Sequence, residues 1–519
     1  MTTIRRDLIK AALMRAFTSI DYNIHIDFHK NYELRKQIIL ADNSLTEEEK
    51  TEAIRLNNRD YDRDKILYNS GTRRICENCN QKCLATLYCE YCVQNYLKAN
   101  FSNWSSGNSE IDDLIRKCQS ETLRPNVIIE WIPYDNLKNI KYLTRGGFSK
   151  IYTANWVGGQ YEKWDSKEQQ LIRFGTHHVI LKELENVANA SQRWFEEAES
   201  HLTISKKYPQ VVRCFGLTKN TSNGNYMLVM RKMDVNLREY LQQNHNQLTW
   251  KERINIIYLI INALHRIHEE NLIHRDLHSG NILYSQFNDS WRISDLGFCG
   301  PADKQPTSIY GNLPYIAPEV INGKEYTFKS DIYSIAMLMW EISFGLPPFI
   351  NYNHDYNFVI NIIDGMRPKI ISEIPSKYKN LMEQCWNANP SERPNIDTLL
   401  ERMEEIKTYY QNNTNELPQL LPKIDEICNN ISSKVFTSKI HKFENLPEPK
   451  NATEEEQEAF HSKLYNLSIP DNNDIQNYNN RKTMQQQLNV NINDEDEVYN
   501  NPNLHSEEQD KLEIPDDGF

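Results

Sequence analysis

The feature that most restricts what this chain can fold into is the stretch HRDLHSGNIL at residues 274–283. It places a carboxylate, Asp276, and an amide, Asn281, five residues apart on one short loop. Such a carboxylate can receive or orient the proton of an attacking hydroxyl, and an amide oxygen can hold a metal ion on phosphate groups. The pair therefore has the side chains that phosphoryl transfer requires, and its meaning depends on whether partner motifs lie at compatible places.

The stretch matches the pattern H-R-D-L-x-x-x-N at every fixed position, so it resembles the catalytic loop of eukaryotic-type protein kinases. Further motifs occur in the order of that family. Residues 179–182 (VILK) resemble the strand with the ATP-binding lysine, residues 293–297 (ISDLG) resemble D-F-G with Leu for Phe, and residues 317–319 match A-P-E. The resemblance covers residues 136–406 and implies an α+β, bilobal kinase fold, with a small β-rich lobe and a larger α-helical lobe.

By this resemblance, Asp276 accepts or orients the proton of the substrate hydroxyl. Lys182 contacts the α- and β-phosphates of ATP, with Glu197 as its preferred ion-pair partner and Glu196 as the alternative. Such a pair holds a flexible ammonium group in place against phosphate. Arg275, beside the catalytic Asp, is expected to bind a phosphate on the activation segment.

The resemblance also implies two cofactors, ATP and Mg²⁺. Asn281 and Asp295 are the side chains it assigns to Mg²⁺, which bridges the phosphates. Leu296 replaces the usual Phe and keeps its apolar packing role.

The expected glycine-rich loop, residues 143–152, departs from the family pattern. Where G-x-G-x-x-G is usual, the chain has Thr144, Gly146 and Ser149, so only the middle glycine remains. That glycine allows the closest approach of backbone to phosphate, while a plain hairpin turn is the alternative for this motif alone. Residues 231–233 resemble the hinge that binds adenine. The nucleotide site implied by the resemblance comprises Leu143, Gly146, Gly147, Ile151, Lys182, Met230, Met233 and Leu283.

Three side chains ahead of the A-P-E match, Thr307, Ser308 and Tyr310, are candidates for phosphorylation. A phosphate on one of them could order the activation segment through Arg275. The alternative for each is that it is simply a polar loop residue.

A second motif lies well before the kinase-like region. Cys76-x-x-Cys79 and Cys89-x-x-Cys92 are separated by nine residues, with Cys83 between them. Two such hooks suit a tetrahedral, structural Zn²⁺ held by four thiolates. The short gap leaves the ligand set open, because Cys83 could replace one hook residue, and unliganded or redox-active thiols are the alternative.

The formal net charge of the chain is −12, and the imbalance lies near its end. Residues 451–519 contain 16 acidic and 4 basic side chains, whereas the residues before them balance. No region has the broad excess of Lys and Arg expected of a nucleic-acid-binding protein. No apolar run approaches the ~18–20 residues that span a bilayer. Ten cysteines without a secretion signal indicate a reducing compartment, so we expect the cytoplasm, with the nucleus left open.

Composition, the cysteine motif and the family resemblance together divide the chain into five parts. These are a charged helical N-terminal region (1–72), a Cys-rich zinc module (73–95), a linker with one helix near 111–118 (96–135), a protein kinase domain (136–406), and a polar, acidic, largely disordered tail (407–519). Residues 5–15 combine basic and apolar side chains and predict an amphipathic first helix, with a mitochondrial presequence as the alternative.

The family resemblance implies transfer of the γ-phosphoryl group of Mg-ATP to protein hydroxyls in intracellular signalling. Two residues leave the hydroxyl type open: His278 replaces the Lys usual in serine/threonine kinases, and Asn312 replaces a Thr common before A-P-E. The flanking sequences resemble the tyrosine-kinase-like group, most of all the expanded set of mycorrhizal fungi. That group mostly modifies Ser/Thr, which is the expectation here, with tyrosine or dual specificity as an alternative.

Two alternatives of another class remain. One is a pseudokinase scaffold that binds nucleotide or partners without turnover, supported by Thr144, Ser149 and His278 but opposed by the presence of Lys182 and Asp276. The other makes the Cys cluster and the tail the functional parts, with the kinase domain as their regulator. The partners expected are protein substrates and upstream signalling proteins, with homo-association for autophosphorylation as a further option.

Overall fold

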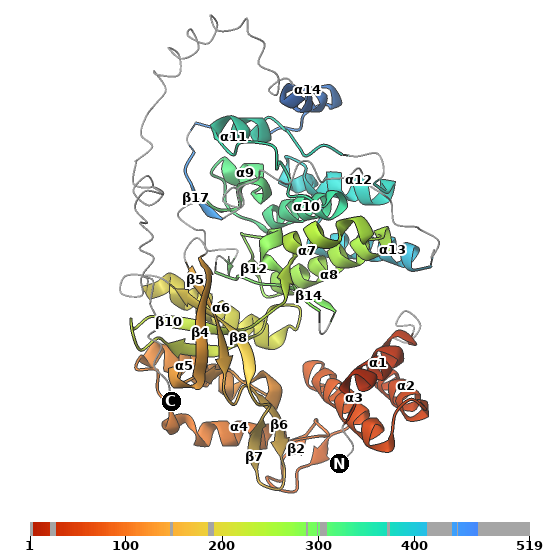
Figure 1. Cartoon of the computed structure of the whole chain (residues 1–519), viewed down its shortest axis with the longest axis vertical. Helices are drawn as coiled ribbons and strands as arrows, with labels where there is room; N and C mark the ends of the chain where they lie inside the picture. Colours follow the sequence, from red (N-terminus) through yellow and green to blue (C-terminus); the bar gives the residue numbers. More distant parts are fainter. Residues whose placement is uncertain are drawn as a thin grey trace, which may run out of the picture. The chain divides into compact units, whose positions relative to one another are not determined.

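A computed structural model describes residues 4–20, 27–145, 149–184, 191–286, 289–297, 299–301, 309–370, 374–412, 438–443 and 445–465 (Figure 1). The N-terminal region folds as three helices, α1 (Arg6–Thr18), α2 (Phe28–Ala41) and α3 (Glu47–Leu67). α3 begins with a capping box, in which Thr46 and Glu49 each accept the backbone N–H of the other. Ile9, Ile39 and Ala53 belong to the apolar core that the three helices share.

The cysteine-rich stretch folds as a short hairpin followed by helices, namely β1 (Arg74–Ile75), β2 (Lys82–Cys83), α4 (Glu90–Ala99) and α5 (Ser109–Ser120). It shares an apolar cluster with a second hairpin from later in the chain, β6 (Tyr161–Asp165) and β7 (Gln170–Arg173). Trp164 and Leu171 of that hairpin pack in the cluster with Tyr88, Val93 and Leu97. The cysteine module is therefore part of the same packed unit as the small lobe.

The small lobe is built on a six-stranded sheet with the order β3-β9-β10-β8-β5-β4. The strands are β3 (Glu130–Trp131), β4 (Leu137–Arg145), β5 (Ser149–Trp156), β8 (His177–Leu184), β9 (Cys214–Lys219) and β10 (Tyr226–Arg231). All neighbours are antiparallel except β3, which runs parallel to β9.

Side chains alternate between the two faces of this sheet, as extended strands require. Val179 and Leu181 of β8 pack in one apolar cluster, whereas Ile180 packs against the other. That second cluster also contains Leu114 from α5 and Leu202 from α6 (Ser191–Lys207). Two helices thus pack against this face, and α6 takes its position from both the sheet and α5.

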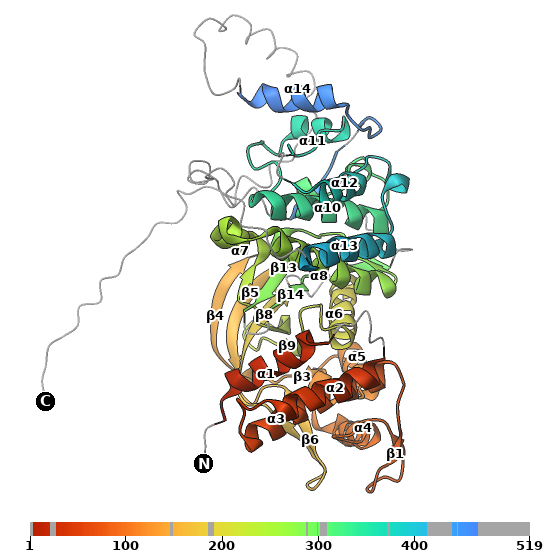
Figure 2. The ribbon, with the colours of Figure 1, turned by 90° about the vertical axis from the view of Figure 1, so that its right-hand side faces the viewer.

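The large lobe is mostly helical (Figure 2). Its helices are α7 (Leu237–Asn244), α8 (Trp250–Glu269), α9 (Pro318–Ile321), α10 (Phe328–Phe344), α11 (Tyr356–Ile363), α12 (Ser376–Cys385) and α13 (Ile396–Asn412). Its short strands are β11 (Val235–Asn236), β12 (Leu272–Ile273), β13 (Ile282–Ser285), β14 (Ser290–Ile293), β15 (Gly300–Pro301) and β16 (Ile309–Gly311). α8 starts at a capping box between Thr249 and Glu252 and is the apolar helix expected from the sequence.

After the kinase-like region the chain returns to the large lobe. β17 (Lys439–His441) pairs antiparallel with β16, and α14 (Glu454–Tyr465) follows. Short 3-10 turns complete the fold: η1 (Phe101–Asn103), η2 (Pro125–Val127), η3 (Tyr134–Asn136), η4 (His245–Gln247), η5 (Ser279–Asn281), η6 (Leu313–Tyr315) and η7 (Pro390–Glu392).

Two parts of the chain differ from what composition alone suggests. The range 96–135, expected to be a linker with one helix near 111–118, contains that helix as α5 and also the strand β3, and it is packed because the apolar face of α5 is buried against the small lobe. The range 407–519, expected to be a largely disordered tail, contains a segment at 438–457 that is hydrogen-bonded to the large lobe. Residues 466–519 lie outside the described part.

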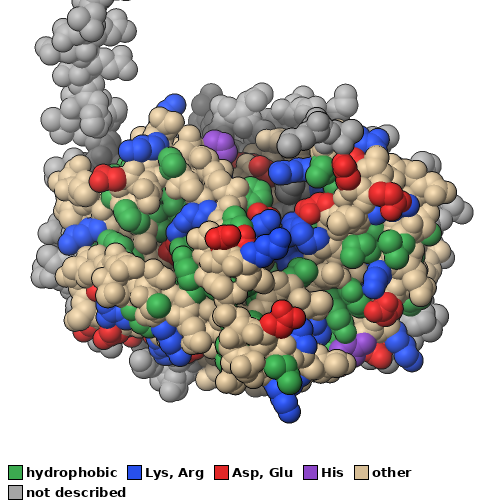
Figure 3. Space-filling view, turned by 90° about the horizontal axis from the view of Figure 1, so that it is seen from below, with side chains coloured by type: hydrophobic (Ala, Val, Ile, Leu, Met, Phe, Trp, Pro, Cys, Tyr) green, Lys and Arg blue, Asp and Glu red, His purple; other side chains and the backbone are tan. Residues whose placement is uncertain are grey.

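The surface shown in Figure 3 carries Lys and Arg side chains interspersed with Asp, Glu and apolar ones. None of the helices that the structure describes combines the length and the apolarity that a bilayer crossing demands.

Candidate active site

A carboxylate from α10 holds the loop that contains Asp276. Asp331 accepts the backbone N–H of His274 at 2.8 Å and that of Arg275 at 3.0 Å. His268, at the end of α8, lies 2.9 Å from the same carboxylate. The loop turns sharply here, with a φ of +69° at Arg275. A buried acid that orients two adjacent backbone donors thus sets the path of the chain into the site.

His274 connects the same loop to the strand that precedes Asp295. It is fully buried, its Nδ1 accepts the backbone N–H of Asp276 at 3.3 Å, and its Nε2 donates to the carbonyl of Ser294 at 3.2 Å. Burial lowers the pKa of this imidazole, which favours the neutral ring with one donor and one acceptor. The two acidic segments of the site are therefore tied together by a single side chain.

Asp276 is only 6% exposed. Burial, together with the negative charge of Asp295, raises the pKa of its carboxyl to about 7. A carboxylate with such a pKa can take a proton from a hydroxyl near neutral pH. Asn281, five residues on, donates from Nδ2 to the backbone carbonyl of Asp276 at 2.9 Å, which holds its amide beside that residue.

Lys182 lies between two carboxylates. Its Nζ is 2.6 Å from Oε1 of Glu197 on α6 and 2.7 Å from Oδ1 of Asp295. Burial opposes charge on this lysine, but the two acids raise its pKa above the usual value. Burial likewise opposes the ionised form of Asp295, but Lys182 holds its pKa below the usual range. Glu197 rather than the exposed Glu196 thus faces the lysine.

Two contacts that the sequence did not reveal connect α6 to the segment after Asp295. His201 is fully buried, and its Nε2 accepts the backbone N–H of Leu296 at 3.1 Å. Gly297 lies so close to Glu197 that an added Cβ would be 2.9 Å from its carboxyl carbon. The position of Glu197 therefore depends on a residue without a side chain at 297.

The residues expected to bind nucleotide have different surroundings. Gly146 and Gly147 lie outside the described residues. On the flanking strands, Thr144 pairs with Ile151 across β4 and β5, and Leu143 is exposed. Three further expected residues are close to one another, since Met230 and Met233 are buried in one cluster and Leu283 packs against it.

Of the three candidate phosphorylation sites, Thr307 and Ser308 lie outside the described residues. Tyr310 is described and is buried, with 6% of its surface exposed. It belongs to β16, and its backbone N–H and carbonyl both bond the hydroxyl of Tyr326. Arg275, expected to bind a phosphate here, has its guanidinium carbon 5.9 Å from the ring centre of the same Tyr326.

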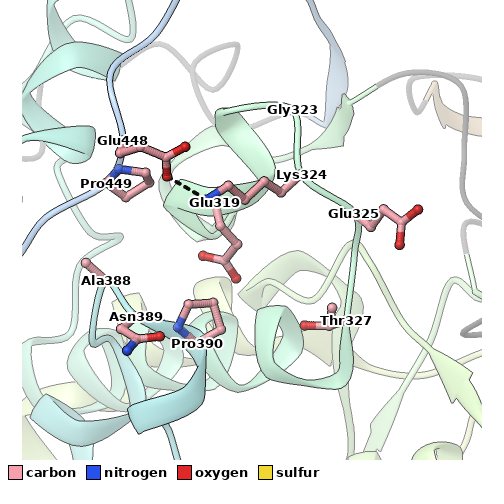
Figure 4. A pocket seen from close by; sticks show the side chains of 10 residues that line it. All are labelled: Glu319, Gly323, Lys324, Glu325, Thr327, Ala388, Asn389, Pro390, Glu448 and Pro449. Atoms are coloured by element: carbon pink, nitrogen blue, oxygen red, sulfur yellow. Dashed lines mark hydrogen bonds and ion pairs between the residues drawn. The ribbon is translucent and has the colours of Figure 1, made fainter.

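Glu319 of the A-P-E match forms a buried bidentate ion pair with Arg393, with both N–O distances at 2.7 Å. A pocket of about 580 Å³ opens beside Glu319 (Figure 4). Its lining residues are Glu319, Gly323, Lys324, Glu325, Thr327, Ala388, Asn389, Pro390, Glu448 and Pro449. None of them is a candidate catalytic or nucleotide-binding residue, so this pocket is separate from the site around Asp276.

The contact that the sequence gave no reason to expect is made by Ser438. Its Oγ lies 2.9 Å from Oδ1 of Asp276 and 3.1 Å from Nε2 of His278. The Nδ1 atom of His278 accepts the backbone N–H of Gly280 at 3.1 Å, so the proton of this ring is on Nε2. The order of donors is then His278 to Ser438 and Ser438 to Asp276. No sequence pattern links these residues, because 162 positions separate Ser438 from Asp276.

The four cysteines of the two hooks lie together. Sγ of Cys76 is 3.7 Å from Sγ of Cys92, and Sγ of Cys79 is 3.6 Å from Sγ of Cys89. All four sulfur atoms lie within 4.8 Å of one another. Cys83 is not part of this group of four: its Sγ is 3.5 Å from the carbonyl of Arg74, and it lies within 4.8 Å of Sγ of Cys89 and of a carboxylate oxygen of Glu90. Four thiolates about 2.3 Å from one Zn²⁺ would be about 3.8 Å apart, which agrees with this cluster.

The family model of the protein tyrosine and serine/threonine kinases matches residues 137–403. That range begins at the first residue of β4 and ends inside α13, so it includes both lobes.

Individual relatives agree with the family model. A probable serine/threonine-protein kinase of Dictyostelium discoideum is 28% identical over 302 residues, which cover 55% of this chain and 16% of the relative. The probable serine/threonine-protein kinase roco7 of the same organism is 27% identical over 57% of this chain and 11% of its own length. A kinase/receptor, R831, of Acanthamoeba polyphaga mimivirus is 26% identical over 59% of this chain and 18% of its own. The chain thus spans less than a fifth of each of these relatives.

Proposed function

The chain belongs to the family of protein tyrosine and serine/threonine kinases, and from this we propose that it transfers the γ-phosphoryl group of ATP to serine and threonine hydroxyls of proteins. The observation that carries the proposal is the assembled Lys182–Glu197–Asp295 triad beside Asp276. Lys182 and Glu197 come from a strand and the helix after it, and Asp295 lies 113 positions beyond the lysine. No structural need of the core explains a lysine buried between two acids.

Each residue has a role in this reaction. Asp276 receives the proton of the acceptor hydroxyl, for which a pKa of about 7 is suited. Lys182 binds the α- and β-phosphates, and Glu197 keeps its ammonium group in place. Asn281 and Asp295 would hold Mg²⁺, which neutralises charge on the phosphates when bound. Catalysis then consists mainly of positioning and charge stabilisation.

A preference for Ser and Thr over Tyr is supported by the short reach from the backbone of the segment that pairs with β16 to the carboxylate of Asp276. Ser438 reaches the catalytic carboxylate with a short side chain while the residues after it pair with β16. A tyrosine on the same backbone would carry its hydroxyl past Asp276, because the ring adds length. The names of the relatives point the same way.

The test is Mg²⁺-dependent transfer of labelled γ-phosphate from ATP to a generic basic protein, followed by phosphoamino-acid analysis. We expect label on Ser and Thr with the unmodified chain and none with Lys182→Met or Asp276→Asn. Asp276→Asn should still bind nucleotide, since it removes only the proton acceptor. Label on tyrosine would overturn the specificity, and bound ATP without any transfer would favour a pseudokinase scaffold.

We also propose that Cys76, Cys79, Cys89 and Cys92 bind one structural Zn²⁺. Four thiolates leave no open coordination position, so the metal would stabilise the module rather than catalyse. Metal analysis of the purified chain should give one zinc per molecule, reduced in Cys79→Ser and unchanged in Cys83→Ser. Equal zinc loss in both variants would overturn this ligand set.

A role in cytoplasmic signalling fits these proposals. The nine cysteines in the described part of the chain are free thiols, which suits a reducing compartment. Fractionation of cells that produce the tagged chain would test the location, and an organellar fraction would contradict it.

A further inference from the structure

The segment that follows the kinase-like region lies across the site as an added strand. Residues 439–441 pair antiparallel with 309–311, with Tyr310 opposite Ile440 and Gly311 opposite Lys439. The two strands form a two-stranded sheet of their own, and the backbone bonds of such a pair fix the register of an extended peptide. Here the register places the preceding residue, Ser438, at Asp276.

The hydroxyl of Ser438 lies where an acceptor hydroxyl must lie. Its Oγ is 2.9 Å from Oδ1 of Asp276, and its hydroxyl proton points to that carboxylate because Nε2–H of His278 occupies the oxygen as a donor. Gly311 keeps this space open, since a Cβ there would lie 3.3 Å from Oδ1 of Asp276. The oxygen is thus hydrogen-bonded for deprotonation by the proposed base.

The residues after Ser438 hold the segment on the large lobe. His441 is buried, with 7% of its surface exposed, and its Nε2 lies 3.0 Å from the carbonyl of Gly311. Phe443 stacks on its ring at 5.8 Å. Farther along, Glu448 forms an ion pair with Lys324 at 2.5 Å, drawn as a dashed line in Figure 4.

The same attachment continues to the end of the segment. The backbone N–H of Lys450 donates to the carbonyl of Ile363 at 3.0 Å. Asn451 accepts the backbone N–H of Ala388 at 2.8 Å. Gly365 allows close passage of this chain, because a Cβ there would be 2.3 Å from the backbone nitrogen of Ala452. Contacts with several separate parts of the large lobe therefore fix the segment on both sides of the ion pair.

We propose that Ser438 is a phosphorylation site of this kinase, modified within the same molecule. The proposal rests on the kinase activity proposed above and names a substrate for that site. Ser438 Oγ forms a bond to the γ-phosphorus of ATP, the bond from that phosphorus to the β–γ bridging oxygen breaks, and ADP leaves. The hydroxyl proton passes to Asp276, so the products are phosphoserine, ADP and one proton.

Because Ser438 is part of the same chain as the site, it competes strongly with the hydroxyls of other proteins. Residues 413–437 join α13 to Ser438, so this acceptor belongs to the same chain as Asp276 and needs no encounter with a second molecule. A phosphate on Ser438 would bring close to two negative charges beside Asp276 and Asp295. Like charges at this spacing repel, so the modified segment leaves and opens the site to other proteins.

The test uses the full chain, treated with phosphatase and then given Mg-ATP at several enzyme concentrations. Mass spectrometry should find phosphate on Ser438, with a rate per molecule that does not change with enzyme concentration. His441→Ala should slow this modification about tenfold, because it removes a buried side chain that bonds β16. The matched control Lys442→Ala, an exposed neighbour, should have no effect.

Labelling of a basic protein in the same tubes separates the two proposals. If the basic protein is labelled and Ser438 is not, this inference is overturned and the kinase activity stands. If neither is labelled, both are overturned. A rate per molecule that rises with enzyme concentration, or equal rates for His441→Ala and Lys442→Ala, would also overturn modification within the molecule.

Discussion

At the scale of single residues, His278 replaces the lysine that is usual in serine/threonine kinases, and its surroundings explain what it does instead. Its ring is neutral, because burial and the nearby Arg238 lower its pKa to about 3. It therefore supplies one directed hydrogen bond to Ser438 rather than a positive charge. The presence of His278 instead of the usual lysine changes how the hydroxyl of Ser438 is hydrogen-bonded. It leaves Lys182, Asp276 and Asp295 in place.

Gly297→Ala should reduce turnover without unfolding the protein. The new Cβ would meet the carboxyl group of Glu197 at 2.9 Å and push it away from Lys182. Misplacement by about 1 Å costs roughly a hundredfold in rate. Steady-state kinetics should show a fall in kcat of that order, while the melting temperature changes little. An unchanged kcat would mean that the ion pair does not position the lysine.

His245 should make the large lobe less stable in acid. Burial, followed by the charge of Arg253, lowers its pKa from 6.5 to about 4, and Arg253 Nη1 lies 2.7 Å from its Nε2. The unfolded chain therefore binds a proton at higher pH than the folded one, and stability falls as pH drops from 6.5 towards 4. The loss from this group is up to about 3 kcal/mol at pH 4. Urea unfolding at several pH values should show a shallower dependence in His245→Gln, and parallel curves would contradict the assignment.

At the scale of elements, α5 determines where α6 lies. Its buried residues Leu114 and Ile115 share a core with Ala198 and Leu202 of α6. Lys206 of α6 adds a salt bridge at 2.9 Å to Glu121, just after α5. A helix outside the region that the family model matches therefore supports the helix that carries Glu197.

Leu114→Ala should lower both stability and activity. The loss of packing around a buried Leu lowers the free energy of unfolding by about 2–5 kcal/mol. The substitution would also leave a cavity in the core that α5 shares with α6. Leu123→Ala, at a position 38% exposed, is the matched control and should behave as the unmodified chain. Thermal unfolding and kcat should be measured together. If Leu114→Ala melts earlier but keeps full kcat, α5 stabilises the lobe without positioning α6.

At the scale of the whole molecule, phosphorylation of the segment at 438–457 would control the access of other proteins to Asp276. While it is docked, the hydroxyl of Ser438 occupies the place of any other acceptor beside Asp276. The kinase would therefore start in a self-occupied state and become available after one round of chemistry on itself. Such a device needs an acceptor segment in the same chain and a strand that binds it, and β16 is that strand.

Preincubation with Mg-ATP should accelerate phosphorylation of a separate protein. We expect a rise of about two- to tenfold in the initial rate, because modified chains no longer hold the segment over Asp276. Ser438→Ala cannot accept phosphate, so its rate should be the same with and without preincubation. Equal acceleration in that variant would assign the effect to another phosphorylation site.

Much of the fold could be predicted because its evidence is local. The catalytic loop, the A-P-E match and the apolar face of α8 each lie within one short stretch, and their order identifies the family. Capping boxes at Thr46 and Thr249 mark helix starts in the same local way. In the range 96–135 the helix predicted near 111–118 is present as α5, but its packing against Leu202 of α6 could not be predicted, because that contact joins residues distant in the chain.

The amino-acid sequence by itself determined the family of this protein, since the order and spacing of its motifs identify a protein kinase and mark Asp276, Asn281 and Asp295 as candidate site residues. The sequence also predicted that the four cysteines form two pairs of neighbouring metal ligands, because two residues between cysteines suit one tight turn. Only the tertiary structure decided what lies next to the catalytic carboxylate. The contact of Ser438 joins positions 162 residues apart, and it depends on the pairing of β17 with β16, two segments that are distant in the chain. Local pattern can reveal a site, but only packing can show what occupies it.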